Sequence, residues 1–137
     1  MYQKIMVPID LAHIDRLGKA LKTASDFARQ HDIGVCYVGV SMETPSSVAH
    51  NPKEYGEKLA AFAKAQRDEF GIETTAKPLF SHDLATDLDR VLIKAIDEIG
   101  ADLVIMASHM PGLAEHFITS NAGYIATHAK VSVFVVR

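Results

Sequence analysis

Short apolar runs rich in β-forming residues alternate with amphipathic helical stripes along the whole chain, and this alternation limits the possible folds more than any other feature. The pattern predicts strands at 4–9, 34–40, 73–80, 102–108 and 131–136. Pro78 lies inside the third run and has no backbone N–H, which favours an edge position or an early end for that strand. The continuous apolar character of the first, fourth and fifth runs predicts burial on both faces of a sheet.

Helices are predicted between these strands. Apolar residues at helical spacing place the first at about 13–31 and the second at about 53–70, after a polar loop that contains Pro45 and Pro52. The sequence Thr86-Asp87-Leu88-Asp89 has the form of a capping box and predicts the start of the third helix, which Gly100 ends. Thr119 or Ser120 is the predicted cap of the fourth and last helix.

Strands that alternate with helices form right-handed βαβ crossovers, so we predict one α/β domain, 1–137, with a doubly wound parallel sheet covered by helices on both faces. In such sheets ligands bind beyond the carboxyl ends of the strands, where the strand order reverses. The loops after Ile9 and after Met106 reach a switch point between the first and fourth strands. We therefore expect the functional site in these loops.

Composition narrows the classes of function. Hydrophobic residues make up 48% of the 137 residues, and the net charge of −3 provides no general attraction to nucleic acid or to anionic membranes. The single cysteine, Cys36, lies in the apolar run VCYVGV and is predicted to be a buried structural thiol. The chain has no signal-peptide pattern and no apolar span of about 20 residues, so we expect a cytoplasmic protein without a membrane span.

The stretch ASHMPGLAEHFITSNAG, 107–123, joins a predicted strand to a predicted helix start, and no Lys or Arg occurs from Ala107 to Ala129. A helix N-terminus offers unpaired N–H groups and a partial positive charge, so it can bind an anion without a basic side chain. Ser120, Asn121 and Ala122 would supply these donors. The alternative is that Ser120 caps the helix and binds nothing.

The chain resembles the universal stress protein family over essentially its whole length. The resemblance is carried by IMVPID at the first strand, GADLVIMASH at the fourth and SNAGYIATHAKVSVFVVR at the end. It implies the Rossmann-like, flavodoxin-like strand order 3-2-1-4-5 of adenine nucleotide alpha hydrolase-like proteins. It also implies a stress-responsive regulator that binds ATP, or AMP or ADP, with an unknown protein partner.

Many family members bind ATP through G-x-x-G, a spacer of nine residues, then G-S or G-T. Here Ala107-x-x-Met110 is followed after eight residues by Thr119-Ser120, so all three glycines are replaced. The chain is similar to a subgroup with ASH, a nearby proline and SNA at the helix start, in which nucleotide binding is also known. The β-branched Thr119 crowds the approach of phosphate oxygens to the backbone, which predicts a weaker grip on the outer phosphates.

The resemblance implies a binding site with two ends. Its adenine and ribose end comprises Pro8, Ile9, Asp10, Val40 and Met106. Its phosphate end comprises Ala107, His109, Met110, Thr119, Ser120, Asn121 and Ala122. His109 would balance part of the phosphate charge, or Mg²⁺ held by the phosphates and by Asp10 through water would do so. Asp10 as a simple helix cap, and Val40 and Met106 as core residues, are the alternatives.

No catalytic constellation is evident. Ser108 and His109 are adjacent, so on a strand they point to opposite faces, and neither a G-x-S-x-G elbow nor a P-loop occurs. The histidines at 109, 116 and 128 lack a recognised zinc spacing, so no metal site is predicted. Two further functions stay open: a nucleotide-independent adaptor with a degenerate phosphate loop, and a slow ATPase or self-phosphorylating protein.

The terminal run VSVFVV, 131–136, predicts a homodimer. A β-forming strand at a sheet edge exposes unpaired backbone groups, and antiparallel pairing of two copies would satisfy them. The family resemblance implies the same interface. The alternative is an edge protected by neighbouring loops of the same chain.

Overall fold

The computed structural model describes residues 1–108 and 121–137, and it confirms the predicted α/β architecture. Its strands are all parallel and form one sheet in the predicted order β3-β2-β1-β4-β5. In chain order they are β1 (Lys4–Ile9), β2 (Gly34–Ser41), β3 (Thr74–Phe80), β4 (Leu103–Ala107) and β5 (Ser132–Val136). β3 lies at an edge, as Pro78 predicts.

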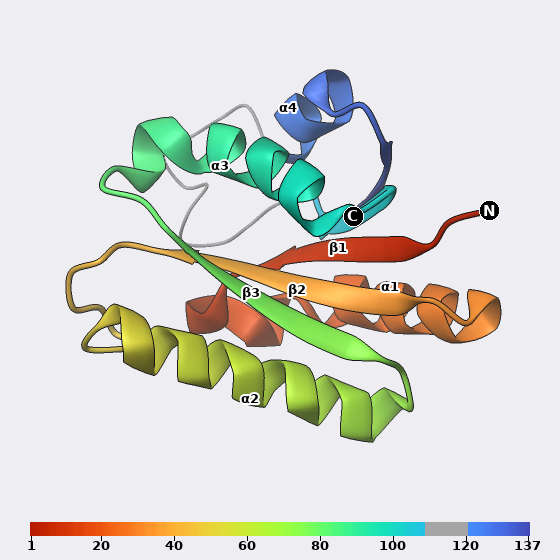
Figure 1. Cartoon of the computed structure of the whole chain (residues 1–137), viewed down its shortest axis with the longest axis horizontal. Helices are drawn as coiled ribbons and strands as arrows, with labels where there is room; N and C mark the ends of the chain where they lie inside the picture. The colour runs from red at the N-terminus through yellow and green to blue at the C-terminus, as the bar shows by residue number, and fades with distance from the viewer. Residues whose placement is uncertain (109–120) are drawn as a thin grey trace.

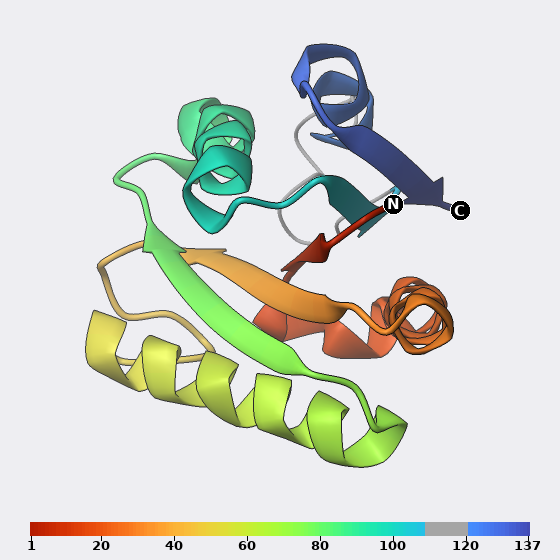
Figure 2. The ribbon, with the colours of Figure 1, turned by 45° about the vertical axis from the view of Figure 1, so that its right-hand side comes forward.

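Helices cover both faces of this sheet. α1 (Gly18–His31) and α2 (Pro52–Phe70) lie on one face, and α3 (Leu84–Ile99) and α4 (Asn121–His128) lie on the other (Figure 1). Figure 2 shows α2 running alongside β3 on the same side of the sheet as α1. The carboxyl ends of β1 and β2 point toward the end of the molecule where α2 and α3 begin.

Each layer of helices encloses its own apolar core. Because successive side chains of a strand point to opposite faces, Ile5 and Val7 of β1 pack toward α1 and α2, whereas Met6 packs toward α3 and α4. Cys36 is buried in the second core, which confirms its predicted structural role. The site must therefore be built at the ends of the strands, where side chains are not committed to either core.

The predicted start of the first helix, at about residue 13, is wrong. A separate 3-10 helix, η1 (Leu11–Arg16), precedes α1, and His13 has the non-helical angles φ −134° and ψ 38°. Asp10 caps η1, because its Oδ1 accepts a hydrogen bond of 3.0 Å from the N–H of Ala12. Leu17 is buried in the core and separates the two helices. The predicted single helix is therefore two helices that meet at Leu17.

The third helix also begins earlier than its predicted capping box. It starts at Leu84, so Thr86 lies inside the first turn. Ser81 acts at this end instead: its Oγ accepts a hydrogen bond from the N–H of Asp83 at 3.2 Å and donates one to the carboxylate of Asp87 at 3.2 Å. The predicted end at Gly100 is confirmed, with φ +75° in the left-handed region that glycine favours.

The predicted burial of the last strand on both faces is wrong. β5 is an edge strand, and the side chains of Ser132 and Phe134 are exposed, Phe134 to 45%. The bounds of β1 match the prediction, and no bound of the other strands differs from its prediction by more than one residue. The predicted cap of the last helix, Thr119 or Ser120, lies outside the described residues.

Candidate functional site

A cavity of about 190 Å³ lies at the carboxyl ends of β1 and β2. Its wall combines the turn after β1, the end of β2, the loop that follows β2, and the first turns of α2 and α3. The residues that line it are Asp10, Leu11, Ala12, Val40, Ser41, Met42, Thr44, Pro45, Ser46, Ser47, Val48, Tyr55 and Leu84. This is the end of the sheet where a doubly wound fold binds ligands.

Asp10 is both a helix cap and a wall of the cavity. Its Oδ1 accepts from the N–H of Ala12, and its Oδ2 lies 2.8 Å from Nδ1 of His13. Only 11% of the Asp10 side chain is exposed, against 33% for His13. These two contacts hold the carboxylate in one orientation at the cavity edge. The two interpretations of Asp10 from the sequence are therefore compatible with each other.

Tyr55 forms a rigid part of the wall. It lies in the first turn of α2, is only 4% exposed, and contacts Phe80 edge-on at 5.8 Å between ring centroids. Its hydroxyl lies over Gly39, where any Cβ would collide with it. Burial raises the pKa of Tyr55, and the negative charge of Asp10 raises it further, so the hydroxyl stays protonated. The cavity therefore presents an aromatic ring with a neutral hydroxyl.

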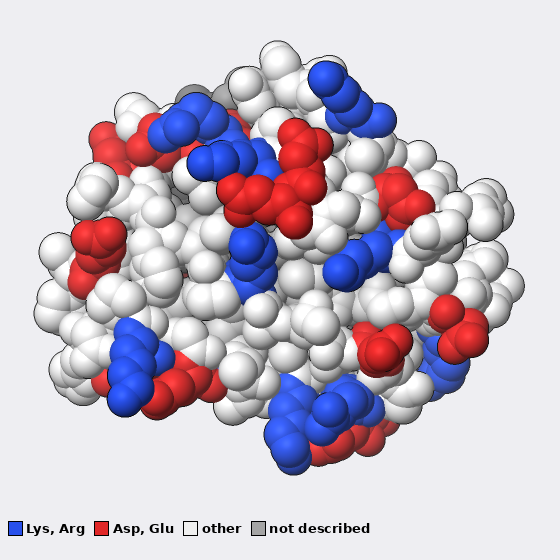
Figure 3. Space-filling model, viewed as in Figure 1, with Lys and Arg blue, Asp and Glu red and all other residues white. Residues whose placement is uncertain are grey.

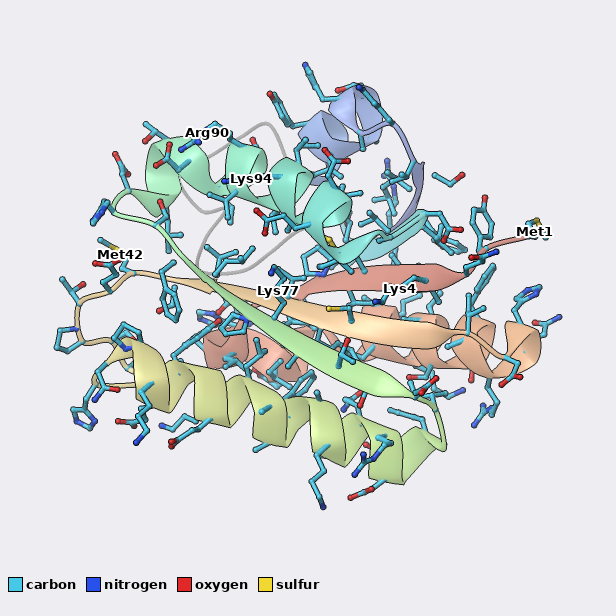
Figure 4. The ribbon with its side chains drawn as sticks, viewed as in Figure 1. Met1, Lys4, Met42, Lys77, Arg90 and Lys94 are labelled. Carbon is cyan, nitrogen blue, oxygen red and sulfur yellow. The ribbon has the colours of Figure 1, made fainter. Side chains whose placement is uncertain are left out.

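The outer wall is the loop between β2 and α2, residues 42–51. Met42, labelled in Figure 4, marks the point where the chain leaves β2. Within the loop, the N–H of Ser46 donates to the carbonyl of Ala49 at 2.8 Å, and Ser46 Oγ accepts from the N–H groups of Val48 and Ala49. Asn51 then caps α2 by accepting from the N–H of Glu54 at 2.8 Å. The loop is thus locally ordered while most of its side chains face solvent.

A second hollow of about 460 Å³ continues from the cavity. It is lined by Leu11, Ala12, Ser47 and Val48, which also line the first cavity, and by Lys58 of α2. Lys58 Nζ donates to the carbonyl oxygen of Val48 and lies 3.3 Å from Oε1 of Glu54. A basic side chain therefore lies at one mouth of the cavity.

The structure brings together some of the predicted site residues. Asp10 and Val40 line the same cavity. Pro8 and Ile9 are buried in β1 immediately before it. Met106 is fully buried in the core between the sheet and the α3–α4 layer, and the strand ends one residue later, at Ala107. Neither Met106 nor Ala107 lines this cavity.

The predicted phosphate end lies mostly outside the described residues. His109, Met110, Thr119 and Ser120 belong to that stretch, and their roles stay predictions. Asn121 is the first described residue of α4. Ala122 is buried in the second core, so only its backbone N–H is available to a ligand at this helix start.

Sequence reasoning missed Tyr55, Leu84 and the detail of the loop wall. The loop itself was predicted, as a polar segment around Thr44–Pro52 that could fold over a ligand, and its residues 44–48 line the cavity. Tyr55 had a partial signal, because Asn51-Pro52 marks a helix start and places Tyr55 in the first turn. The fit of its hydroxyl over Gly39 depends on two segments sixteen residues apart, and no local pattern encodes it.

On one face of the molecule, basic side chains pair with acidic ones. Figure 3 shows basic and acidic side chains interspersed on the face formed by β3, α2 and α3. Lys77 and Lys94 pair with Glu98, and Arg90 pairs with Asp87. Figure 4 labels these three basic residues. Within residues 1–108 and 121–137 no three His, Cys, Asp or Glu residues group as a metal site requires. No helix in these ranges is long and apolar enough to cross a bilayer.

The fold agrees with a comparison of the whole chain against known families. The model of the universal stress protein family matches residues 1–137, and the chain belongs to this family. A curated relative, universal stress protein G of Shigella flexneri, is 26% identical over 144 residues and covers 100% of both chains.

Solved structures share the fold at lower identity. The universal stress protein from Archaeoglobus fulgidus in complex with dAMP is 17% identical, with a TM-score of 0.69 over 99% of this chain and 98% of that one. A universal stress protein family protein from Arabidopsis thaliana with AMP bound is 15% identical, with a TM-score of 0.63 over 98% and 90% of the two chains. At these identities the likeness establishes the architecture.

Proposed function

We propose that the protein is a regulatory module that binds an adenine nucleotide in the cavity at the ends of β1 and β2. The observation that carries the proposal is the wall itself, which joins the fixed carboxylate of Asp10 to the apolar surfaces of Val40 and Tyr55. A flat heterocycle fits against apolar side chains, and a carboxylate accepts hydrogen bonds from ribose hydroxyls. The AMP and dAMP complexes of structures with the same fold support this ligand class.

The phosphates would extend from this cavity toward the N-terminus of α4. The first N–H groups of a helix have no partner within the helix, and its dipole favours an anion. No Lys or Arg occurs from Ala107 to Ala129. This stretch therefore provides no lysine or arginine side chain to hold a triphosphate. We therefore expect binding to depend mainly on the nucleoside, with Mg²⁺ contributing only when ATP is the ligand.

Isothermal titration of the full chain with adenosine, AMP and ATP, with and without Mg²⁺, tests this proposal. Affinity that rises from adenosine to ATP would show that the α4 end grips phosphate. Similar affinity for all three would locate the binding energy at the nucleoside. Failure of all three to bind would overturn the proposal and favour the adaptor that works without a nucleotide.

The same proposal includes a homodimer through β5. The two edges of the sheet differ: β3 carries Lys77 and Pro78, whereas β5 (Ser132–Val136) carries neither a charge nor a proline. Charged residues and proline discourage pairing between chains, so β3 is protected and β5 is not. The exposed ring of Phe134 adds apolar surface beside the open edge. Antiparallel pairing of two β5 strands would cover both features.

A further inference from the structure

The outer wall of the cavity is joined to α2 by few contacts. Within the described residues, the contact of Lys58 Nζ with the Val48 carbonyl is the one side-chain hydrogen bond between the stretch 42–49 and α2. Glu54 contacts both Lys58 and the loop. Its Oε1 lies 3.3 Å from Lys58 Nζ, and its Oε2 accepts from the N–H of His50 at 3.2 Å.

The part of the loop that Lys58 holds behaves as one unit. Ser46 bonds through its N–H to the Ala49 carbonyl, and through its Oγ to the N–H groups of Val48 and Ala49, so residues 46–49 form a small closed turn. Thr44, Pro45, Ser46, Ser47 and Val48 all line the cavity. A displacement of Val48 away from Lys58 would therefore move this wall and widen the cavity.

The contact between Lys58 and the loop lies where it can break when the loop moves away from the cavity. It lines the hollow that continues from the cavity, and half of its side chain is exposed. A contact made by a solvated ammonium group is weak and breaks readily, so it suits an element that opens and closes rather than a permanent wall.

We propose that Lys58 is a positioning residue that latches the loop 42–51 over the cavity and so sets how fast the nucleotide leaves. This inference builds on the proposed function, because the ligand whose release it governs is the adenine nucleotide. Glu54 orients the latch by holding Lys58 and the backbone of His50 at once. The ligand contacts remain those of Asp10, Val40 and Tyr55.

Release kinetics test the latch. AMP carrying a fluorescent methylanthraniloyl group on its ribose would be bound to the full chain and chased with unlabelled AMP in a stopped-flow instrument. Lys58→Met removes the donor but keeps most of the apolar stem, and we expect release about three- to tenfold faster, as the loss of one hydrogen bond predicts. Lys58→Arg restores a donor and should release the nucleotide at nearly the wild-type rate.

Lys64→Met is the matched control. Lys64 lies on the same helix and pairs with Asp68 at 3.3 Å, but it does not contact the loop. Its release rate should equal that of the wild type. Equal rates for Lys58→Met and Lys64→Met would overturn the latch, and so would a drop in thermal stability of Lys58→Met large enough to account for the faster release.

A measurement without ligand separates the latch from the proposed function. In the free protein, the amide hydrogen of His50, which donates to Glu54 of α2, should exchange faster in Lys58→Met than in Lys64→Met, because the loop separates from α2 more often. Unchanged exchange would overturn the latch. Wild-type protein that binds no adenine nucleotide would overturn the proposed function instead, and the exchange result would then decide alone whether Lys58 holds the loop.

Discussion

At the scale of single residues, Asp10 shows how one side chain can serve the fold and the site together. Its Oδ1 accepts from the N–H of Ala12 and so caps η1, while its Oδ2 meets His13, and the same carboxylate edges the cavity. A cap fixes the backbone after β1, and a fixed backbone fixes the carboxylate. The sequence left the cap and the ligand contact as alternatives because both need an Asp at the end of the first strand.

Two substitutions at Asp10 separate these roles. Asp10→Asn keeps an oxygen that accepts from the Ala12 N–H, so we expect nearly wild-type stability, but AMP affinity about three- to tenfold lower because its amide nitrogen cannot accept from ribose. Asp10→Ala removes the cap as well and should cost about 1 kcal/mol of unfolding free energy. Urea denaturation and AMP titration measure the two effects. Wild-type affinity in Asp10→Asn would leave Asp10 as a cap alone.

For other site residues the sequence predicted a place near the site but not the neighbours that each side chain contacts. Val40 was predicted in the site and lines the cavity, whereas Met106 was predicted beside it and is fully buried in the core. Both lie one residue before the end of an apolar strand, so the pattern treats them alike. What separates them is which helix packs over each strand end, and that is a property of the assembled layers.

At the scale of elements, the sequence located every helix and strand of the described residues except η1, and erred mainly at helix starts. The helical stripe of 13–31 continues through η1 into α1, so periodicity could not reveal the break at Leu17. Likewise Thr86 matched a capping box, yet α3 begins at Leu84 with Ser81 bonding its first turn. Helix starts depend on side-chain hydrogen bonds that several nearby polar residues can make equally well.

The packing of α3 against α4 has a testable electrostatic cost at Asp89. Burial raises the pKa of this carboxyl, and His128 opposes the rise. The Oδ1 of Asp89 is buried and has no hydrogen-bond partner among the described residues. A raised pKa in the folded state means that ionisation of Asp89 lowers stability once the pH exceeds the ordinary aspartate value. Below that value the carboxyl is protonated in both states and the cost disappears.

Asp89→Asn should therefore raise the urea midpoint at pH 7, with a smaller gain as the pH falls toward the ordinary pKa of an aspartate. Asp97→Asn, an exposed carboxylate on the same helix, is the matched control and should show no such dependence on pH. A gain for Asp89→Asn that is equal at pH 7 and at pH 4 would contradict an origin in the ionisation of Asp89.

At the scale of the whole molecule, the sheet order decides which strands lie at the edges and which ends of strands meet. The order β3-β2-β1-β4-β5 places the carboxyl ends of β1 and β2 side by side, and α2 and α3 both begin there. It also leaves β3 and β5 with one neighbour each. The cavity and the proposed dimer surface are thus two consequences of one topology.

The dimer is tested best at Phe134, because its side chain is exposed whereas that of Val133 is partly buried against the core. Phe134→Lys places a charge on the open edge and should shift the protein from dimer to monomer in sedimentation velocity, with little change in thermal stability of the monomer. Thr75→Lys places the same charge on the opposite edge, on β3, and should leave the dimer intact. A Phe134→Lys variant that stays dimeric would locate the interface elsewhere.

The sequence by itself determined the class of fold, the strand order through the family resemblance, the edge position of β3 and the end of the sheet that holds the site. These follow from local periodicity, from proline and glycine positions, and from the general rule for parallel sheets. Only the tertiary structure decided that Tyr55 fills the space over Gly39, that Met106 belongs to the core, and that Lys58 reaches the loop after β2. Each of these depends on how far apart packed layers lie, and no stretch of sequence encodes that distance alone.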